Sequence, residues 1–126
     1  MKIVRTGSAI LVALTFTATV LAGDAPATKK TFQQEIGLQI DLIKKADVEK
    51  LKIRFTERQR KKITKKMLQK AVKEVGGYSV DELVHKVEPG KYKGQLTAKI
   101  KMKNGRSLTT FMLVDGEWQA DTLWFK

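Results

Sequence analysis

The sequence predicts an α+β domain in which two to three N-terminal amphipathic helices pack on a C-terminal antiparallel β-meander. Three observations predict this class. Apolar residues recur at helical spacing over residues 31–84, and they alternate with polar residues over residues 94–125. Two Asx-Gly dipeptides, which are strong signals for hairpin turns, interrupt the second region. Because helices have to cover the apolar face of such a sheet, we expect a single domain over residues 31–126.

The composition excludes several kinds of functional site. The 126 residues contain no cysteine, which excludes disulfide bonds, cysteine-ligated zinc and a thiol nucleophile. The one histidine, His85, has no carboxylate partners at a ligand spacing, so we expect neither a metal site nor a cofactor. With 30% charged and 42% hydrophobic residues, the chain is typical of neither a disordered protein nor an integral membrane protein.

Residues 1–23 have the pattern of a secretory signal peptide. A short positive start precedes the uncharged apolar run of residues 9–22. The run ends in the small residue Ala22, and Gly23 follows it. The run is shorter than the roughly 20 apolar residues that span a bilayer, which favours cleavage near Ala22 or Gly23 over a membrane anchor. We therefore expect an exported protein, periplasmic or secreted, in which residues 24–30 form a flexible lead-in to the domain.

Three residues with short oxygen-bearing side chains mark where helices are expected to begin, namely Thr31, Asp47 and Thr64. An apolar stripe of helical period follows each of them. The stripes are Phe32, Ile36, Ile40 and Ile43; Val48, Leu51 and Phe55; and Met67, Leu68, Ala71, Val72 and Val75. The stripe slips over residues 58–63, which favours a break between the second and third helices over one bent helix, and Gly76 is expected to end the third.

The segment that follows leaves the position of His85 open. Residues Ser79 to Glu82 match a capping box, so we expect one further short turn of helix. If residues 83–88 then form a strand, His85 faces the core. If the helix continues instead, His85 lies on the surface one turn beyond Asp81.

The two dipeptides Asn104-Gly105 and Asp115-Gly116 are expected to form two-residue hairpin turns. Turns of this length fix the register of the strands they join. The expected strands are residues 94–103, 106–114 and 117–125. The expected pairs are Lys103 with Arg106, Ile100 with Thr109, Ala98 with Phe111, Val114 with Glu117, Leu113 with Trp118, and Phe111 with Ala120.

This register predicts one apolar face and one mixed face. The apolar face, which we expect to meet the helices, collects Leu96, Ala98, Ile100, Met102, Thr109, Phe111, Leu113, Trp118, Ala120, Thr122 and Trp124. On the outer face, apolar residues interrupt the polar ones: Leu108, Met112, Val114 and Leu123, joined by Phe125. These are either scattered surface residues or a contact through which the outer sheet face forms a homodimer. Glu117 and Asp121 are expected to point outward.

Helices followed by a meander that closes on Asp115-Gly116-Glu117-Trp118 and a terminal aromatic strand resemble the nuclear-transport-factor-2-like (cystatin-like α+β cone) superfamily, in particular its small exported bacterial members. The resemblance covers about residues 31–126 and implies a cone-like curled sheet. The family includes isomerases and dehydratases that use a carboxylate base inside the cone, as well as members without catalysis.

The residues favour the members without catalysis. The inward sheet face offers only Thr109, Thr122 and Ser107 as polar groups, and a base would have to come from a helix, as Glu35 or Asp41. We therefore expect no catalytic residue, with a small cone-fold isomerase or dehydratase as the alternative. If the cone keeps a cavity, Phe111, Trp118, Trp124 and Ile100 would line it, and an apolar small molecule would suit it. The same residues could equally fill the core.

The excess positive charge is concentrated in one segment. Residues 44–73 hold 13 basic and three acidic residues. The densest block supplies the candidate anion contacts Arg58, Arg60, Lys61, Lys62, Lys65 and Lys66. They form either a solvated helix face or a contact with anionic components of the cell envelope. Nucleic acid is disfavoured, because the block has no interleaved aromatic residues for stacking. The sequence thus predicts a small exported non-enzymatic binding or interaction domain, with adhesion to the envelope through the basic helix as an alternative.

Overall fold

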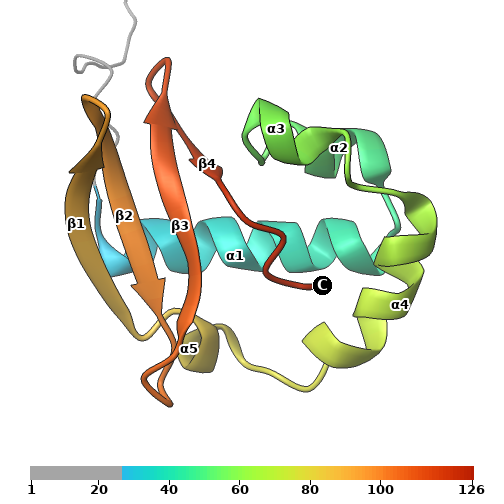
Figure 1. Cartoon of the computed structure of the whole chain (residues 1–126). Coiled ribbons are helices and arrows are strands. Elements are labelled where there is room, and N and C mark those ends of the chain that lie inside the picture. Colours follow the sequence, from blue (N-terminus) through green and yellow to red (C-terminus); the bar gives the residue numbers. More distant parts are fainter. Residues whose placement is uncertain (1–26) are drawn as a thin grey trace, which may run out of the picture.

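The structure, a computed structural model, describes residues 27–126, so the predicted signal peptide, its cleavage site and residues 24–26 of the predicted lead-in lie outside the described residues. Helices come first along the described chain and strands last, which confirms the predicted α+β class (Figure 1). The helices are α1 (Lys29–Lys44), α2 (Val48–Lys52), α3 (Glu57–Arg60), α4 (Lys65–Val75) and α5 (Val80–Leu83). The strands are β1 (Lys86–Tyr92), β2 (Gln95–Lys101), β3 (Ser107–Val114) and β4 (Glu117–Ala120). Within residues 27–126, no helix combines the length and apolar character needed to cross a membrane.

Side-chain caps determine where most of these helices begin. Asp47 and Thr64 each accept a hydrogen bond from the backbone N–H three residues further on, at 3.3 and 3.2 Å, as predicted. Ser79 and Glu82 form the predicted capping box at the start of α5. A break between the second and third predicted helices is confirmed, but the predicted number of two to three helices is wrong. The described residues contain five, because the second predicted helix ends at Lys52 and Glu57–Arg60 forms a short helix of its own.

The start of α1 differs from the prediction. Its cap is Thr28 rather than Thr31, and the Thr28 hydroxyl accepts the backbone N–H of Thr31 at 3.1 Å. Lys29 and Lys30 in the first turn are exposed. This turn therefore adds nothing to the apolar stripe, and periodicity cannot reveal it.

The sheet has one strand more than predicted. It is an open antiparallel meander in the order β1-β2-β3-β4, so β1 and β4 are its edges. The strand left open over residues 83–88 is present only in part, since β1 begins at Lys86 and continues through Pro89 and Gly90 to Tyr92. Proline is tolerated on an edge strand, where its missing N–H faces away from the neighbouring strand. A two-residue turn with positive φ at Lys93 (50°) and Gly94 (83°) joins β1 to β2.

The first predicted turn is wrong in detail, although most of its register survives. Gly105 has a φ of 89°, whereas Asn104 does not have a positive φ. The N–H of Met102 bonds to the carbonyl of Arg106 at 2.7 Å, so the loop has three residues and Lys103 does not pair with Arg106. A register shift between Ile100 and Lys101 compensates for the extra loop residue. As a result Ile100 still pairs with Thr109, and Ala98 with Phe111, as predicted.

The second turn is confirmed. Asp115 and Gly116 have positive φ values of 50° and 81°, and Val114 pairs with Glu117, Leu113 with Trp118 and Phe111 with Ala120.

The last strand is shorter than predicted, because β4 ends at Ala120. Ala120 forms a parallel bridge to Phe55, with its N–H donating to Arg54 at 3.0 Å and its carbonyl accepting the N–H of Thr56 at 2.9 Å. The chain then leaves the sheet and runs between β3 and α4 (Figure 1). The prediction that Phe125 joins the outer face is therefore wrong. Phe125 is buried, and its ring packs edge-on against Phe55 at 5.8 Å between centroids.

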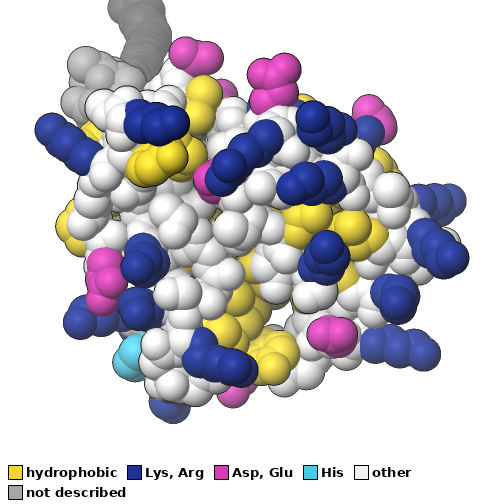
Figure 2. All heavy atoms as spheres, viewed as in Figure 1, with side chains coloured by type: hydrophobic (Ala, Val, Ile, Leu, Met, Phe, Trp, Pro, Cys, Tyr) yellow, Lys and Arg dark blue, Asp and Glu magenta, His cyan; other side chains and the backbone are white. Residues whose placement is uncertain are grey.

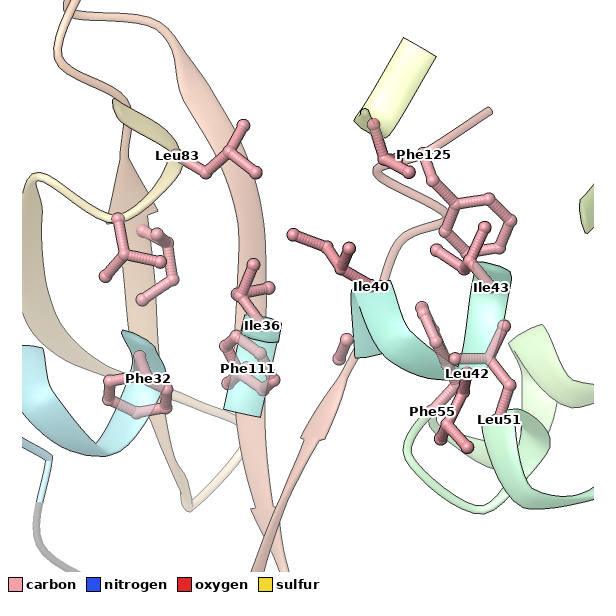
Figure 3. Packing of buried hydrophobic residues seen from close by; sticks show 14 of the residues in the cluster. Phe32, Ile36, Ile40, Leu42, Ile43, Leu51, Phe55, Leu83, Phe111 and Phe125 are labelled. Atoms are coloured by element: carbon pink, nitrogen blue, oxygen red, sulfur yellow. The ribbon is translucent and has the colours of Figure 1, made fainter. Parts of the chain in front are cut away.

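The core lies between α1 and the inner face of the sheet and continues to α2 and α4 (Figure 3). The ring of Phe32 on α1 lies 4.9 Å from that of Phe111 and 5.3 Å from that of Trp118. Leu96, which was predicted to face the helices, is 42% exposed, because it lies near the tip of the β1–β2 hairpin.

Candidate functional site

The residues predicted to line a cavity lie in two places. Ile100 and Phe111 are fully buried and Trp118 is 9% exposed, all three in the core that α1 covers. Trp124, on the C-terminal segment, is half-buried and lines an open groove instead. The structure therefore does not bring the four residues together around one space.

The groove has a volume of about 330 Å³ and lies between the end of α4, the β2–β3 loop and the C-terminal segment. Its apolar walls include Tyr78, Met102, Leu108 and Trp124, and Glu74, Arg106 and Lys126 also line it. We call it the terminal groove. Figure 2 shows this side of the molecule, with hydrophobic side chains inside a hollow between the sheet and α4.

Trp124, which forms one wall of this groove, is held in place by a hydrogen bond to a residue of the core. The indole N–H of Trp124 donates to Oε1 of Gln39 at 2.7 Å, and Gln39 is completely buried on α1. Gln39 Nε2 in turn donates to Glu35 at 2.9 Å. Glu35 also forms an ion pair with Arg54, whose pKa is raised by the side-chain hydrogen bond to Glu35. One buried polar chain thus joins the groove wall to the segment between α2 and α3.

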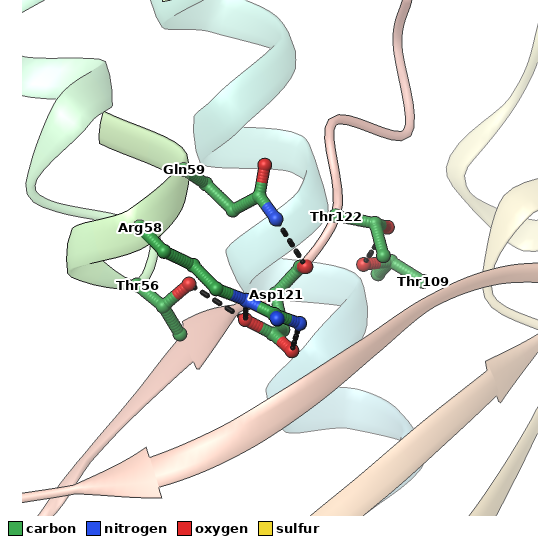
Figure 4. A network of polar contacts seen from close by, with 6 residues as sticks. All are labelled: Thr56, Arg58, Gln59, Thr109, Asp121 and Thr122. Atoms are coloured by element: carbon green, nitrogen blue, oxygen red, sulfur yellow. Dashed lines mark hydrogen bonds and ion pairs between the residues drawn. The ribbon is translucent and has the colours of Figure 1, made fainter. Parts of the chain in front are cut away.

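A second polar cluster fixes the start of the C-terminal segment (Figure 4). The carboxylate of Asp121 accepts a hydrogen bond from the Thr56 hydroxyl at 2.7 Å and one from Arg58 Nε at 2.9 Å. Gln59 Nε2 donates to the Asp121 carbonyl at 2.9 Å. The pKa of Arg58 is raised, chiefly by its hydrogen bond to Asp121. The prediction that Asp121 points outward to water is wrong, because its side chain is only 16% exposed and holds the chain against α3.

The residues that a proton-transfer reaction would need do not meet. Glu35 is engaged by Arg54 and Gln39, and Asp41 is exposed. His85 lies between α5 and β1 and is exposed, so the question left open by the sequence is answered in favour of the surface. The hydroxyls of Thr109 and Thr122 lie 2.6 Å apart and contact each other. Within the described residues, no group of three or more His, Asp or Glu side chains could hold a metal ion.

The predicted anion contacts are only partly brought together. Arg58, Arg60 and Lys61 line one shallow depression, together with Lys52 and Glu57. Lys62, Lys65 and Lys66 are exposed but do not line it. Lys52 is missing from the prediction because the dense charge block begins only at residue 58. The excess of basic residues over the wider segment 44–73 includes Lys52 and could have indicated it.

In comparisons with protein-family models, with curated proteins and with solved structures, nothing matched this chain.

Proposed function

We propose that the protein is a non-enzymatic binding domain whose ligand, an apolar small molecule, occupies the terminal groove. The observation that carries this proposal is the groove itself, an open volume of about 330 Å³ with Tyr78, Met102, Leu108 and Trp124 on its walls. Ligand sites are typically concave, with volumes of about 300–1,000 Å³ and a few polar groups among apolar walls. In this groove the polar groups come from Glu74, Asn104, Arg106, Ser107 and Lys126 and make up much of the exposed lining. The groove lies at the lower end of this range, which favours a small ligand.

The walls of the groove are held in place before any ligand arrives. Trp124 is fixed by Gln39, and Asp121 anchors the same segment to α3. A preformed wall lowers the entropic cost of binding, because the ligand does not have to order it. The inner sheet face offers a poorer location, since α1 already covers Phe111 and Trp118 there.

The enzyme alternative has less support. A general base must lie within hydrogen-bond reach of its substrate. Glu35 and Asp121 are instead engaged in ion pairs with Arg54 and Arg58, and neither lines the terminal groove. Glu74, which does line it, lies on α4 and is exposed to solvent.

We further propose that the chain is an exported member of the nuclear-transport-factor-2-like superfamily with a cone-like curled sheet. The order of helices followed by an antiparallel meander and the packing of α1 on the sheet support the fold. The pattern of residues 1–23 supports export. A homodimer through the outer sheet face remains a prediction, and Met112 and Val114 on that face are half-buried.

Binding of an apolar dye, with displacement by small apolar compounds, tests the groove. We expect Leu108→Arg to lower dye affinity at least tenfold, because the longer charged side chain fills and polarises the groove. Leu96→Arg, on the exposed hairpin tip, is the matched control and should bind as the wild type does. Tyr78→Ala changes a half-exposed wall residue without touching the core and should weaken binding in a folded protein.

Native mass spectrometry of the protein recovered from the exporting cell provides an independent measurement, with a small-molecule adduct as the expected result. Equal dye binding by the wild type, Leu108→Arg and Tyr78→Ala would show that the groove is not the site.

A further inference from the structure

The positive charge of this chain is concentrated on the helices opposite the sheet. Residues 44–73 carry 13 basic and three acidic residues, whereas the remaining described residues nearly balance, with ten basic and nine acidic. In the structure this segment forms α2, α3 and α4. Figure 2 shows Lys and Arg side chains spread over these elements.

The depression on this side concentrates cations at one place. Lys52, Arg58, Arg60 and Lys61 line it, with Glu57 as the one acidic lining residue. The Asp121 carboxylate offsets the charge of Arg58. Glu49 lies 3.7 Å from the ammonium group of Lys52 and offsets part of its charge, although the Glu49 side chain is itself 86% exposed. Arg60 and Lys61 therefore carry most of the attraction for an anion, with a smaller share from Lys52.

Arg60 is partly positioned in advance. Its Nε donates to the carbonyl of Phe55 at 2.9 Å, and Phe55 is fully buried. This bond fixes the stem of a guanidinium group that lines the depression, so less side-chain entropy is lost when the group meets an anion.

An exposed aliphatic side chain follows the first of these cations in the chain, although it does not line the depression itself. Ile53 follows Lys52 directly and is 57% exposed, more than any other large hydrophobic residue in the part of the chain that the structure describes. A polysaccharide or a nucleic acid gains little from an isoleucine, since nucleic acids use aromatic stacking. A phospholipid surface uses both groups, because lysine and arginine attract its phosphates and an apolar side chain enters the boundary with the acyl chains.

We propose that the surface formed by Lys52, Ile53, Arg60 and Lys61, which we call the α2–α3 surface, docks the protein on an anionic phospholipid membrane. The cationic groups lie at the level of the phosphates and Ile53 reaches the acyl boundary. The terminal groove is lined by none of these four residues, so docking does not depend on the proposed ligand.

Flotation with vesicles tests the proposal. The probes are vesicles of phosphatidylcholine with one-quarter phosphatidylglycerol, and vesicles of phosphatidylcholine alone. We expect the full chain to partition at least tenfold more strongly onto the anionic vesicles at low salt, with the preference falling as salt rises. Comparison between variants cancels any contribution from the apolar run of residues 9–22.

The position of the charge is tested by two variants that change net charge equally. Lys52→Glu with Lys61→Glu should lower partition onto anionic vesicles at least tenfold. Lys91→Glu with Lys99→Glu reverses two exposed lysines on the sheet and should lower it less than threefold. If Glu at these helix positions disturbs folding, judged by circular dichroism, the Gln variants at the same residues replace them. Equal losses in the two pairs would overturn the proposal, because net charge alone would then explain the binding.

The role of Ile53 separates a membrane from other polyanions. Ile53→Ser should lower partition several-fold at high salt, where the apolar contact contributes most, whereas Leu38→Ser at another exposed position should not. If the protein instead binds double-stranded DNA or an acidic polysaccharide as strongly as vesicles, with no change in Ile53→Ser, that result would assign the surface to that polyanion. Absence of binding to anionic vesicles would reject the proposal outright.

Discussion

The carboxylate of Glu82 shows how one side chain links the sequence to stability. It accepts hydrogen bonds from the N–H and the hydroxyl of Ser79 at 3.0 and 3.1 Å, and these bonds lower its pKa below the ordinary value of 4.5. A carboxyl group with a lowered pKa in the folded state stabilises the fold above its unfolded pKa. That contribution is lost as the pH falls through the folded value.

Ser79→Ala removes the hydroxyl donor but keeps the backbone N–H, so it should raise the pKa of Glu82 only part of the way toward 4.5, which NMR titration of the side-chain carbons measures directly. The variant should also lose somewhat less stability than the wild type when the pH is lowered from 7 to below 4.5, because the hydroxyl's share of the interaction with the carboxylate is already missing. Glu88→Gln is a matched control that leaves the capping box intact. A normal pKa for Glu82 in the wild type would show that these hydrogen bonds do not hold the carboxylate in solution.

At the scale of elements, caps and alternating patterns could be predicted because they depend on residues close together in the sequence. The caps at Asp47, Thr64 and Ser79 and the turn at Asp115-Gly116 belong to this group. The extent of strand β1 could not be predicted beyond the alternative of a strand over residues 83–88. Its proline is acceptable only on an edge strand, and the order of strands is not visible in the sequence. The end of β4 could not be predicted from the sequence either, because it depends on contacts with Phe55 and Arg58, which lie more than 60 residues away in the chain.

The candidate site could be predicted only in part for the same reason. Trp124 was assigned to the inner face on the assumption that the last strand continues. The chain instead turns at Asp121, and the turn places Trp124 in the wall of the terminal groove. The basic residues were found as a block, but their division between the depression and the remaining surface depends on the packing of α2 and α3.

The two Asx-Gly turns provide a prediction at this scale. Asp115 has a positive φ, so Asp115→Gly removes strain and should change stability by less than about 0.5 kcal/mol. Asn104 does not have a positive φ, and its side chain accepts the N–H of Arg106 at 2.9 Å. Asn104→Gly should therefore cost about 1 kcal/mol, from the lost bond and the added backbone entropy of the unfolded chain. Urea unfolding measures both, and equal costs would indicate that the turns have the same geometry.

For the whole molecule, the C-terminal segment is the part that joins the two proposed surfaces. One end of it, Trp124, lines the terminal groove, and the other end, Asp121, pairs with Arg58 beside the α2–α3 surface. The segment is therefore both a wall of the groove and a counter-charge for the basic side. A change at Asp121 should act on the two surfaces in opposite directions.

Asp121→Ala tests this arrangement. The lost acceptor leaves the buried hydroxyl of Thr56 without its carboxylate, which should lower the free energy of unfolding by about 1–3 kcal/mol in urea. The released segment should weaken dye binding several-fold, because the Trp124 wall becomes less ordered. Vesicle binding should instead rise about twofold or more, because Arg58 is no longer neutralised by its partner.

Glu117→Ala, which removes an exposed acid from β4, is the control for net charge and should leave dye binding unchanged. A variant that had lost its structure would not combine weaker dye binding with stronger vesicle binding. Native circular dichroism of Asp121→Ala checks that the variant is folded. If dye and vesicle binding instead fall together in a folded Asp121→Ala protein, the terminal groove and the α2–α3 surface are not linked through this carboxylate.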